Sequence, residues 1–108
     1  MSSLITTHVL DTAAGRPAAG VPVRLEFHGE GWETLASART DEDGRVRELG
    51  PGSLPAGVYR LVFDTAAYHG ERAFFPEITV CFRITDGQAH HHVPVLLSPF
   101  AFSTYRGS

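Results

Sequence analysis

The sequence has few features that would direct the chain to a membrane, a nucleic acid or an oxidising compartment. Its single cysteine, Cys81, can form no internal disulfide and cannot build a cysteine-based zinc site. There is no Lys/Arg-rich run, and the formal net charge is −3, which argues against nucleic acid or an anionic membrane as the main partner. No segment approaches the ~20 apolar residues that a membrane-spanning helix needs.

Neither end of the sequence carries a recognisable targeting signal. Residues 1–8 have neither the basic stretch nor the apolar region of a signal peptide. The last three residues, Arg106-Gly107-Ser108, differ from the peroxisomal Ser-Lys-Leu type. We therefore expect a cytoplasmic protein.

The common catalytic motifs are also missing. No glycine-rich phosphate-binding loop is present. None of the serines Ser98, Ser103 and Ser108 lies in a Gly-x-Ser-x-Gly elbow, and no nucleophile–base–acid trio is legible. These absences argue against a nucleotide-binding protein and against a conventional serine hydrolase.

The residues that are present predict one folded domain over residues 1–108. This length is typical of a single domain, and 43% of the residues are hydrophobic, which is enough for a core. The dominant pattern is an alternation of apolar and polar residues with a period of two, as in strands that bury one face. Short turn sequences such as Asp43-Gly44 and Asp86-Gly87 separate the strands.

This pattern predicts an all-β sandwich of seven to eight short strands with one short helix. Pro94 favours an edge position or an irregular ladder for its strand. A helix of one or two turns is expected between a cap at Asp64 or Thr65 and Gly70. The expected strands lie within residues 4–10, 21–27, 32–39, 59–63, 78–85, 91–97 and 100–105. The last of these is aromatic and would suit edge-to-edge pairing between two subunits, as an alternative to filling a core.

Six histidines are the most distinctive feature of the composition, and three of them are consecutive. On a strand, His90 and His92 project to one face and His91 to the other. Two histidines spaced in this way supply only two of the ligands that zinc requires, so the metal signal is weak and we predict no metal. A strand over residues 4–10 places His8 on one face with Leu4, Thr6 and Leu10. Residue patterns alone leave His8 as a hydrogen-bonded rim histidine and Arg45 as a solvated arginine.

Three blocks of sequence resemble the transthyretin-related family, and specifically its 5-hydroxyisourate hydrolase branch. The resemblance covers essentially the whole chain in the right order, and the terminal Tyr-Arg-Gly-Ser is its most discriminating part because it separates the hydrolases from the hormone carriers. The blocks are Thr7-His8-Val9-Leu10-Asp11-Thr12 with Gly15-Arg16-Pro17-Ala18 and Val21-Pro22-Val23; Thr40-Asp41-Glu42-Asp43-Gly44-Arg45; and His92-Val93-Pro94-Val95-Leu96-Leu97-Ser98-Pro99 running to Ser103-Thr104-Tyr105-Arg106-Gly107-Ser108. Shorter matches are Tyr59-Arg60-Leu61 and Phe74-Phe75-Pro76-Glu77.

The chain departs from the family at His91, where a Tyr is frequent, and at Phe100-Ala101-Phe102, where a Tyr-Gly-Tyr run is frequent.

The resemblance implies a transthyretin-like (prealbumin-like) fold and identifies the site residues. It implies catalytic roles for His8, Arg45, His92 and Ser108, and substrate contacts from His8, Arg45, Tyr105 and Arg106. In this interpretation His8 and His92 position and deprotonate a water, while Arg45 clamps the substrate and stabilises the oxyanion. Which histidine is the base stays open.

The reaction implied by the resemblance opens the cyclic amide of 5-hydroxyisourate to give 2-oxo-4-hydroxy-4-carboxy-5-ureidoimidazoline, in urate breakdown. It needs no cofactor. The resemblance also implies a homotetramer, a dimer of dimers with the sites at the dimer–dimer interface. Two alternatives are a non-enzymatic carrier of a small aromatic ligand in a central channel and a zinc-dependent hydrolase that uses the histidines.

Overall fold

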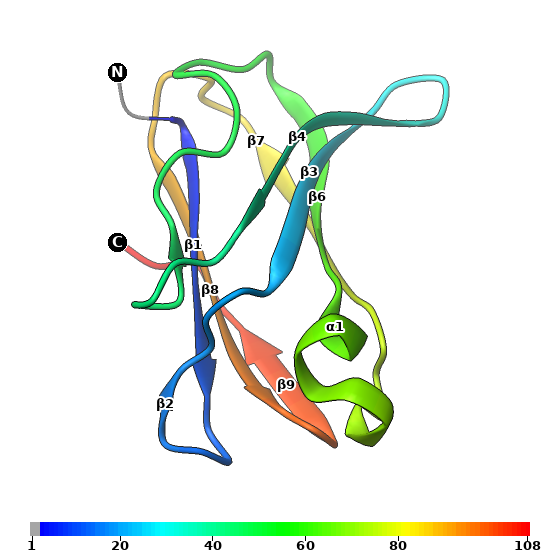
Figure 1. Ribbon diagram of the computed structural model, residues 1–108. Coiled ribbons are helices and arrows are strands. Elements are labelled where there is room, and N and C mark those ends of the chain that lie inside the picture. The colour runs from blue at the N-terminus through cyan, green and yellow to red at the C-terminus, as the bar shows by residue number, and fades with distance from the viewer. Residues whose placement is uncertain (1–2) are drawn as a thin grey trace.

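The computed structural model describes residues 3–108 as two β-sheets that pack face to face (Figure 1). The first sheet has the order β2 (Arg16–Pro17), β1 (Ile5–Asp11), β8 (His91–Ser98) and β9 (Ala101–Thr104), and β5 (Arg45–Val46) also pairs with β1. The second sheet has the order β4 (Trp32–Arg39), β3 (Pro22–His28), β6 (Gly57–Phe63) and β7 (Ile78–Ile84). The expected all-β sandwich is confirmed. All seven expected strands are present, and the additional β2 and β5 are two residues long.

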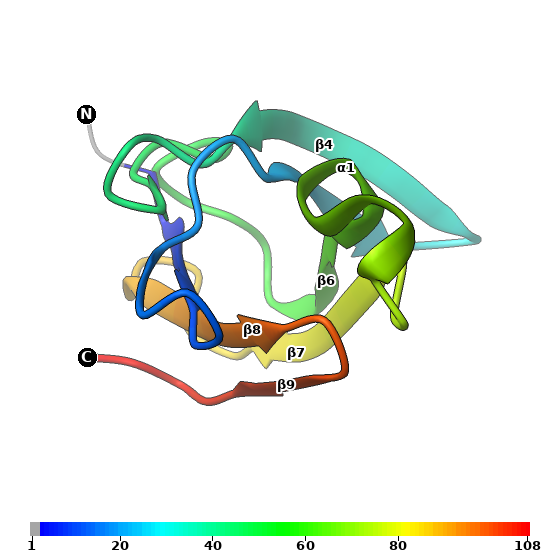
Figure 2. The same cartoon turned by 60° about the horizontal axis from the view of Figure 1, so that its bottom comes forward.

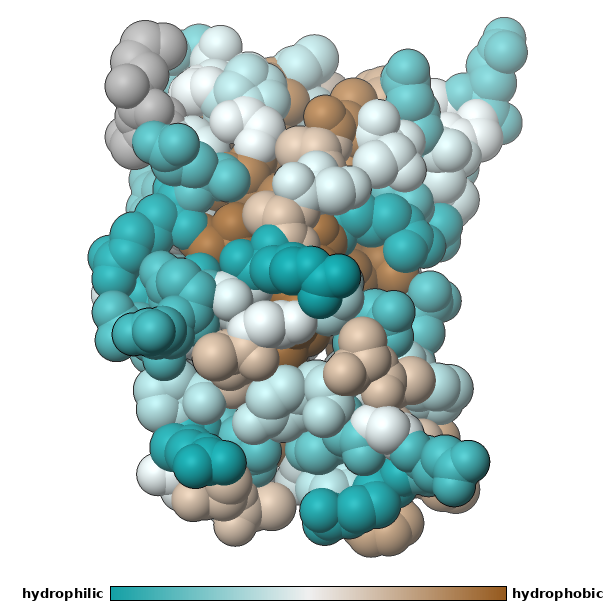
Figure 3. All heavy atoms as spheres, viewed as in Figure 1, coloured by the Kyte–Doolittle hydropathy of each residue, from teal (hydrophilic) through white to brown (hydrophobic). Residues whose placement is uncertain are grey.

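The core lies between the sheets, and the period-two pattern selects the side chains that enter it. Along β1 the buried residues alternate with half-buried ones, so Ile5 and Val9 face the core while Thr6, His8 and Leu10 face outward. Leu25 and Leu61 enter the core from the opposite sheet. Figure 3 shows mainly hydrophilic residues on the visible face, with hydrophobic residues appearing between the two sheets. Such burial contributes about 25 cal/mol per Å² of apolar surface removed from water.

The expectation that Leu4 shares the outward face with His8 is wrong. Leu4 precedes the strand and is buried in the core. The strand period does not extend to a residue outside the ladder, and the chain turns Leu4 inward, where its backbone N–H bonds to the carbonyl of Pro51.

Pro94 lies in a central strand and not at an edge, because β8 is flanked by β1 on one side and β9 on the other. The alternative of an irregular ladder is confirmed. β8 pairs with β9 from Ser98, opposite Ala101, to Val95, opposite Thr104. Pairing with the C-terminal segment then resumes at one isolated bridge between His92 and Gly107. Proline has no N–H to donate, so the ladder is interrupted beside Pro94. The interruption leaves Tyr105 and Arg106 outside the regular strand.

A short helix, α1 (Thr65–His69), follows β6 and continues as one turn of 3₁₀ helix over Gly70–Arg72. The carboxylate of Asp64 accepts a hydrogen bond from the backbone N–H of Ala67, and Gly70 ends the helix, as expected from the sequence. No helix within residues 3–108 is long and apolar enough to cross a membrane.

Candidate functional site

The candidate site lies on the outward face of the first sheet, where β5, β1 and β8 run side by side. Their register sets the neighbours: His8 pairs with Arg45 on one side, and Thr6 pairs with His92 on the other. Side chains of directly paired residues have Cβ atoms about 5 Å apart. The sheet therefore gathers residues that are more than eighty positions apart in the sequence on one surface.

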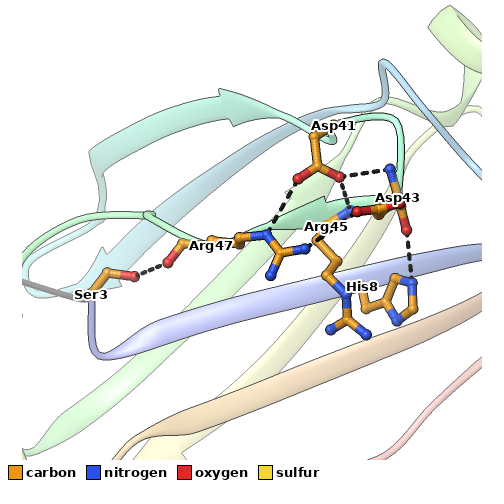
Figure 4. Close-up of polar contacts among 6 residues, drawn as sticks. All are labelled: Ser3, His8, Asp41, Asp43, Arg45 and Arg47. Atoms are coloured by element: carbon orange, nitrogen blue, oxygen red, sulfur yellow. Dashed lines mark hydrogen bonds and ion pairs between the residues drawn. The ribbon is translucent and has the colours of Figure 1, made fainter.

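A tight turn before β5 aims Arg45 at this surface. The side chain of Asp41 accepts hydrogen bonds from the backbone N–H groups of Asp43 (2.9 Å) and Arg45 (3.0 Å). Gly44 has a φ of +76°, and a Cβ at this position would lie 2.3 Å from the carbonyl oxygen of Val9. Only glycine fits both the left-handed backbone and this close approach to β1. Figure 4 shows the turn above the strand, with the side chains of Arg45 and His8 next to each other.

The same turn fixes the tautomer of His8. Nε2 of His8 lies 2.9 Å from the carbonyl oxygen of Asp43, and a carbonyl can only accept, so Nε2–H is the donor (Figure 4). In the neutral ring the lone pair is therefore on Nδ1. His8 is oriented by a backbone group and keeps one nitrogen available for a ligand.

His92 is held by two contacts. Nδ1 lies 2.8 Å from the hydroxyl of Thr6, and the backbone carbonyl accepts a hydrogen bond of 2.8 Å from the N–H of Gly107. A Cβ on Gly107 would lie 2.6 Å from Cδ2 of the His92 ring, so the glycine lets the C-terminal tail cross directly beside the imidazole. Burial, followed by the positive charges of Arg45, His90 and His8, lowers the pKa of His92. His92 is therefore neutral at pH 7 and can accept a proton.

A shallow hollow on this surface brings part of the predicted site together. Arg45, His92 and Ser108 are among the residues that line it, together with Thr6 and His90. His8 lies beside the hollow through its pairing with Arg45. Tyr105 and Arg106 line a separate, mostly apolar pocket on the other side of His92, toward β7. The predicted residues thus form two groups. His8, Arg45, His92 and Ser108 lie at or beside the polar hollow, and Tyr105 and Arg106 line the apolar pocket, which shares His92 with the hollow.

The electrostatic character of the hollow suits an anionic or electron-rich ligand. Within residues 3–108, no carboxylate forms an ion pair with Arg45, whereas Arg47 beside it pairs with Asp41 (3.6 Å) and Asp43 (3.4 Å). A guanidinium without a protein partner keeps its five donors for a planar, oxygen-rich molecule. Over the same residues, no group of three or more His, Cys, Asp or Glu side chains is arranged to hold a metal ion.

Two residues that position the site were given no role from the sequence: Thr6 and Asp41. Gly107 belongs to the terminal Tyr-Arg-Gly-Ser that the resemblance identifies, but its contact with the His92 ring was not predicted. Thr6 alternates with His8 on the outward face, so the period of β1 contains its signal once the strand is assigned. Asp41 has the Asp-x-Asp-Gly pattern of a tight turn. The role of Gly107 has no local signal, because the ring that it contacts comes from β8.

Comparison with known proteins is consistent with this arrangement. The model of the HIUase/Transthyretin family matches residues 5–107. The chain belongs to this family. It is 45% identical to the 5-hydroxyisourate hydrolase of Salmonella typhi, over 99% of the chain and 82% of the relative. It is also 47% identical to the uric acid degradation bifunctional protein TTL of Arabidopsis thaliana over 96% of the chain, but spans only 37% of that protein's length.

Solved structures separate the two branches of the family by identity more than by fold. The 5-hydroxyisourate hydrolase of Klebsiella pneumoniae has a TM-score of 0.86 and 39% identity, with all of both chains covered. Sea bream transthyretin in complex with thyroxine has a TM-score of 0.87 and 32% identity, covering 95% of this chain and 93% of its own. The fold is therefore shared equally, while the sequence is more similar to the hydrolase. The predicted resemblance to the hydrolase branch is confirmed.

Proposed function

We propose that the chain hydrolyses 5-hydroxyisourate, opening its cyclic amide to the carboxylated ureidoimidazoline in urate catabolism. The observation that carries the proposal is the placement of His8, Arg45 and His92 on one sheet face, with Ser108 at the same hollow. This set supplies a base, an anion-binding group and a proton donor without a nucleophilic side chain. Curated relatives of nearly full-length similarity bear the name of this hydrolase, which supports the assignment.

Arg45 is the residue assigned to binding and to charge stabilisation. Attack of water on the amide carbonyl builds negative charge on its oxygen, and a preorganised guanidinium stabilises this charge more in the transition state than in the ground state. The Asp41 turn holds the backbone of Arg45 in place before substrate arrives. Because Arg45 has no ion pair within residues 3–108, binding a substrate need not break one.

His92 is the better candidate for the general base. Its lowered pKa keeps the ring neutral at pH 7, and Thr6 holds its Nδ1, so Nε2 is left to accept a proton from water. His8, with Nε2–H bonded to Asp43, presents Nδ1 and suits orientation of the water or of the substrate. Ser108 reaches the hollow from the tail, and Tyr105 and Arg106 shape the apolar side of the pocket next to His92.

The proposed assembly is a homotetramer with the hollow facing a partner. Within residues 3–108, β7 and β9 are edge strands, and they lie on the same side of the molecule (Figure 2). Residues of both strands line one pocket. Beside them Phe74 and Phe100 are 67% and 72% exposed, and Phe75 packs edge-on against Phe102. Exposed aromatics next to free strand edges favour subunit pairing. Light scattering on a dilution series tests the tetramer, and activity in a species shown to be monomeric contradicts a site completed by assembly.

The cytoplasmic location, the single domain over residues 1–108 and action without a metal stay predictions. One hydrophobic core between the two sheets supports the single domain. The non-enzymatic carrier is the second candidate, favoured by the structural match to a thyroxine-bound transthyretin. The zinc-dependent hydrolase is the third, and it uses the same histidines.

The deciding experiment measures the ultraviolet decay of 5-hydroxyisourate, freshly generated by uricase, with and without protein in chelator-containing buffer. We expect acceleration beyond the spontaneous rate by wild type and loss of that acceleration in His92→Ala. His28→Ala, on the other sheet, is the matched control and keeps full activity. A folded wild-type protein without acceleration favours the carrier, and activity that appears only after zinc is added favours the zinc hydrolase.

A further inference from the structure

The hydroxyl of Thr6 connects two histidine rings. Oγ1 lies 2.9 Å from Nε2 of His90 and 2.8 Å from Nδ1 of His92. The two rings are nearly parallel, with centroids 6.3 Å apart and an interplanar angle of 21°. His90, Thr6 and His92 therefore form one continuous chain of hydrogen bonds between β1 and the start of β8.

A hydroxyl has a single hydrogen, so the two hydrogen bonds of Thr6 cannot be set independently. If Thr6 donates to His90, its oxygen must accept from Nδ1–H of His92. If it donates to His92 instead, it must accept from Nε2–H of His90. The tautomer of one ring thus fixes the tautomer of the other.

The two ends of this chain differ in their access to solvent. His90 is exposed, whereas His92 is partly buried beside the hollow. The groups facing His92 are predominantly cationic, and positive charge on its ring is unfavourable there. The charged groups that act on its ring are Arg45 from β5, His90 before β8 and His8 from β1. Arg47 and Ser108 line the hollow on one side of His92, and Arg83 and Arg106 line the pocket on the other.

We propose that Thr6 is a positioning residue that couples His92 to His90 and lets the proton taken up at His92 leave through His90. This inference rests on the proposed hydrolysis and deepens it. The three side chains are hydrogen-bonded to one another directly, so the coupling needs no bound ligand.

Nε2 of His92 takes a proton from the attacking water, while its Nδ1 proton passes to Oγ1 of Thr6 and the Thr6 proton passes to Nε2 of His90. His92 remains neutral and His90 carries the charge, which it loses as its Nδ1 proton enters solvent. In the reverse movement His90 takes a proton from solvent at Nδ1, the Nε2 proton of His90 passes to Thr6, and the Thr6 proton passes to Nδ1 of His92. His92 then protonates the leaving nitrogen from Nε2, which restores the starting state. Over a full turnover one proton is released, because the product carboxylic acid is ionised at pH 7 and the ureido nitrogen is not basic.

The first test reads the coupling without any turnover. The side-chain ¹⁵N resonances of His92 report its tautomer in the wild type, in His90→Gln, in Thr6→Val and in the double variant. We expect His90→Gln to shift these resonances when Thr6 is present and to leave them unchanged in the Thr6→Val background. A shift of equal size in both backgrounds overturns the coupling. This result does not depend on the identity of the substrate.

The second test reads proton transfer during turnover. In about 1 mM buffer we expect kcat to fall about tenfold in Thr6→Val and in His90→Gln, and to recover when a small imidazole buffer is added to carry the proton. Thr6→Ser keeps the hydroxyl and stays within about twofold of wild type. Matched controls are Thr12→Val, which removes a hydroxyl that donates to the backbone carbonyl of Leu97, and His28→Gln.

The outcomes separate the relay from a merely structural contact and from failure of the proposed function. Unchanged kcat in both variants, or a loss that buffer does not restore in either, overturns the relay. Thermal unfolding of Thr6→Val and Thr6→Ser shows whether the fold is intact. If wild type does not hydrolyse 5-hydroxyisourate at all, the proposed function fails, while the resonance test still decides the coupling.

Discussion

The outward faces of the two sheets both carry charged residues, but they use them differently. On the second sheet Glu26 is 5% exposed and is bonded by Arg24 (2.7 Å) and Arg60 (2.6 Å), and Thr34 donates to the same carboxylate. Arg60 also lies 4.1 Å from the centre of the Trp32 ring. On the first sheet Arg45 lies beside His8 and His92, and within residues 3–108 no carboxylate pairs with it.

The difference shows how a structural polar surface on a sheet is distinguished from a ligand-binding one. Where each charge has a partner, the network stabilises the sheet and leaves little to bind a ligand. Where a cation lies beside histidines and no carboxylate within residues 3–108 pairs with it, the surface retains its capacity for an external molecule. The same alternation of polar residues thus marks a structural network on one sheet and the candidate site on the other.

The largest expected effect is on the unpaired side. Arg45→Ala should lower kcat by about 10²–10³, because it removes the donor assigned to the developing oxyanion. Arg47→Ala, next to it but already paired with Asp41 and Asp43, is the matched control and should stay near wild type. Steady-state kinetics on fresh 5-hydroxyisourate gives the comparison. Near-normal turnover in Arg45→Ala would refute its role.

On the paired side, Glu26→Gln should affect stability and spare activity. Loss of the charge leaves Arg24 and Arg60 without their shared carboxylate, and we expect a cost of about 2 kcal/mol in urea unfolding. The hydrogen bond from Arg24 lowers the pKa of Glu26 against the effect of burial. The wild-type advantage should therefore be present above the ordinary glutamate pKa and disappear as pH falls through the lowered one. Exposed Glu33→Gln serves as control, and a change in kcat per folded Glu26→Gln molecule would break the comparison.

The C-terminal tail gives a smaller effect on the site. Gly107→Ala places a methyl group against the His92 ring and should displace it, lowering kcat about tenfold with little loss of stability. Gly31→Ala, at a turn where a Cβ would meet nothing within 4 Å and where φ is not positive, controls for a glycine replacement as such. A crystal structure or the His92 resonances would show the displaced ring. An unmoved ring with normal turnover would show that the tail does not position His92.

The smallest effect concerns pH near neutrality. Because burial and the neighbouring cations lower the pKa of His92, its base form persists to a pH below the ordinary histidine value of about 6.5. We expect kcat/KM to be flat from pH 8 to about 6.5 and to fall only at lower pH. A fall that begins above pH 7 would assign the limiting protonation to another group.

Much of the fold followed from the sequence because strand periodicity is a local property. Val23, Leu25 and Phe27 alternate with polar residues, and they lie inward in the structure as this pattern requires. The cap at Asp64 and the stop at Gly70 were equally local. The central position of β8 was not a local property. Pro94 suggests an edge strand, and β8 is central because its pairing with the C-terminal segment is interrupted opposite Tyr105 and Arg106.

The sequence by itself determined the family, and through that resemblance it supplied the residues proposed to carry the chemistry: His8, Arg45, His92 and the terminal Tyr-Arg-Gly-Ser. Tertiary structure decided their arrangement, because register between strands distant in sequence pairs Thr6 with His92 and His8 with Arg45. It also decided the hydrogen-bonded tautomer of His8 and the contact between Gly107 and the His92 ring. Such contacts depend on distances across the sheet, and local propensity contains no information about them.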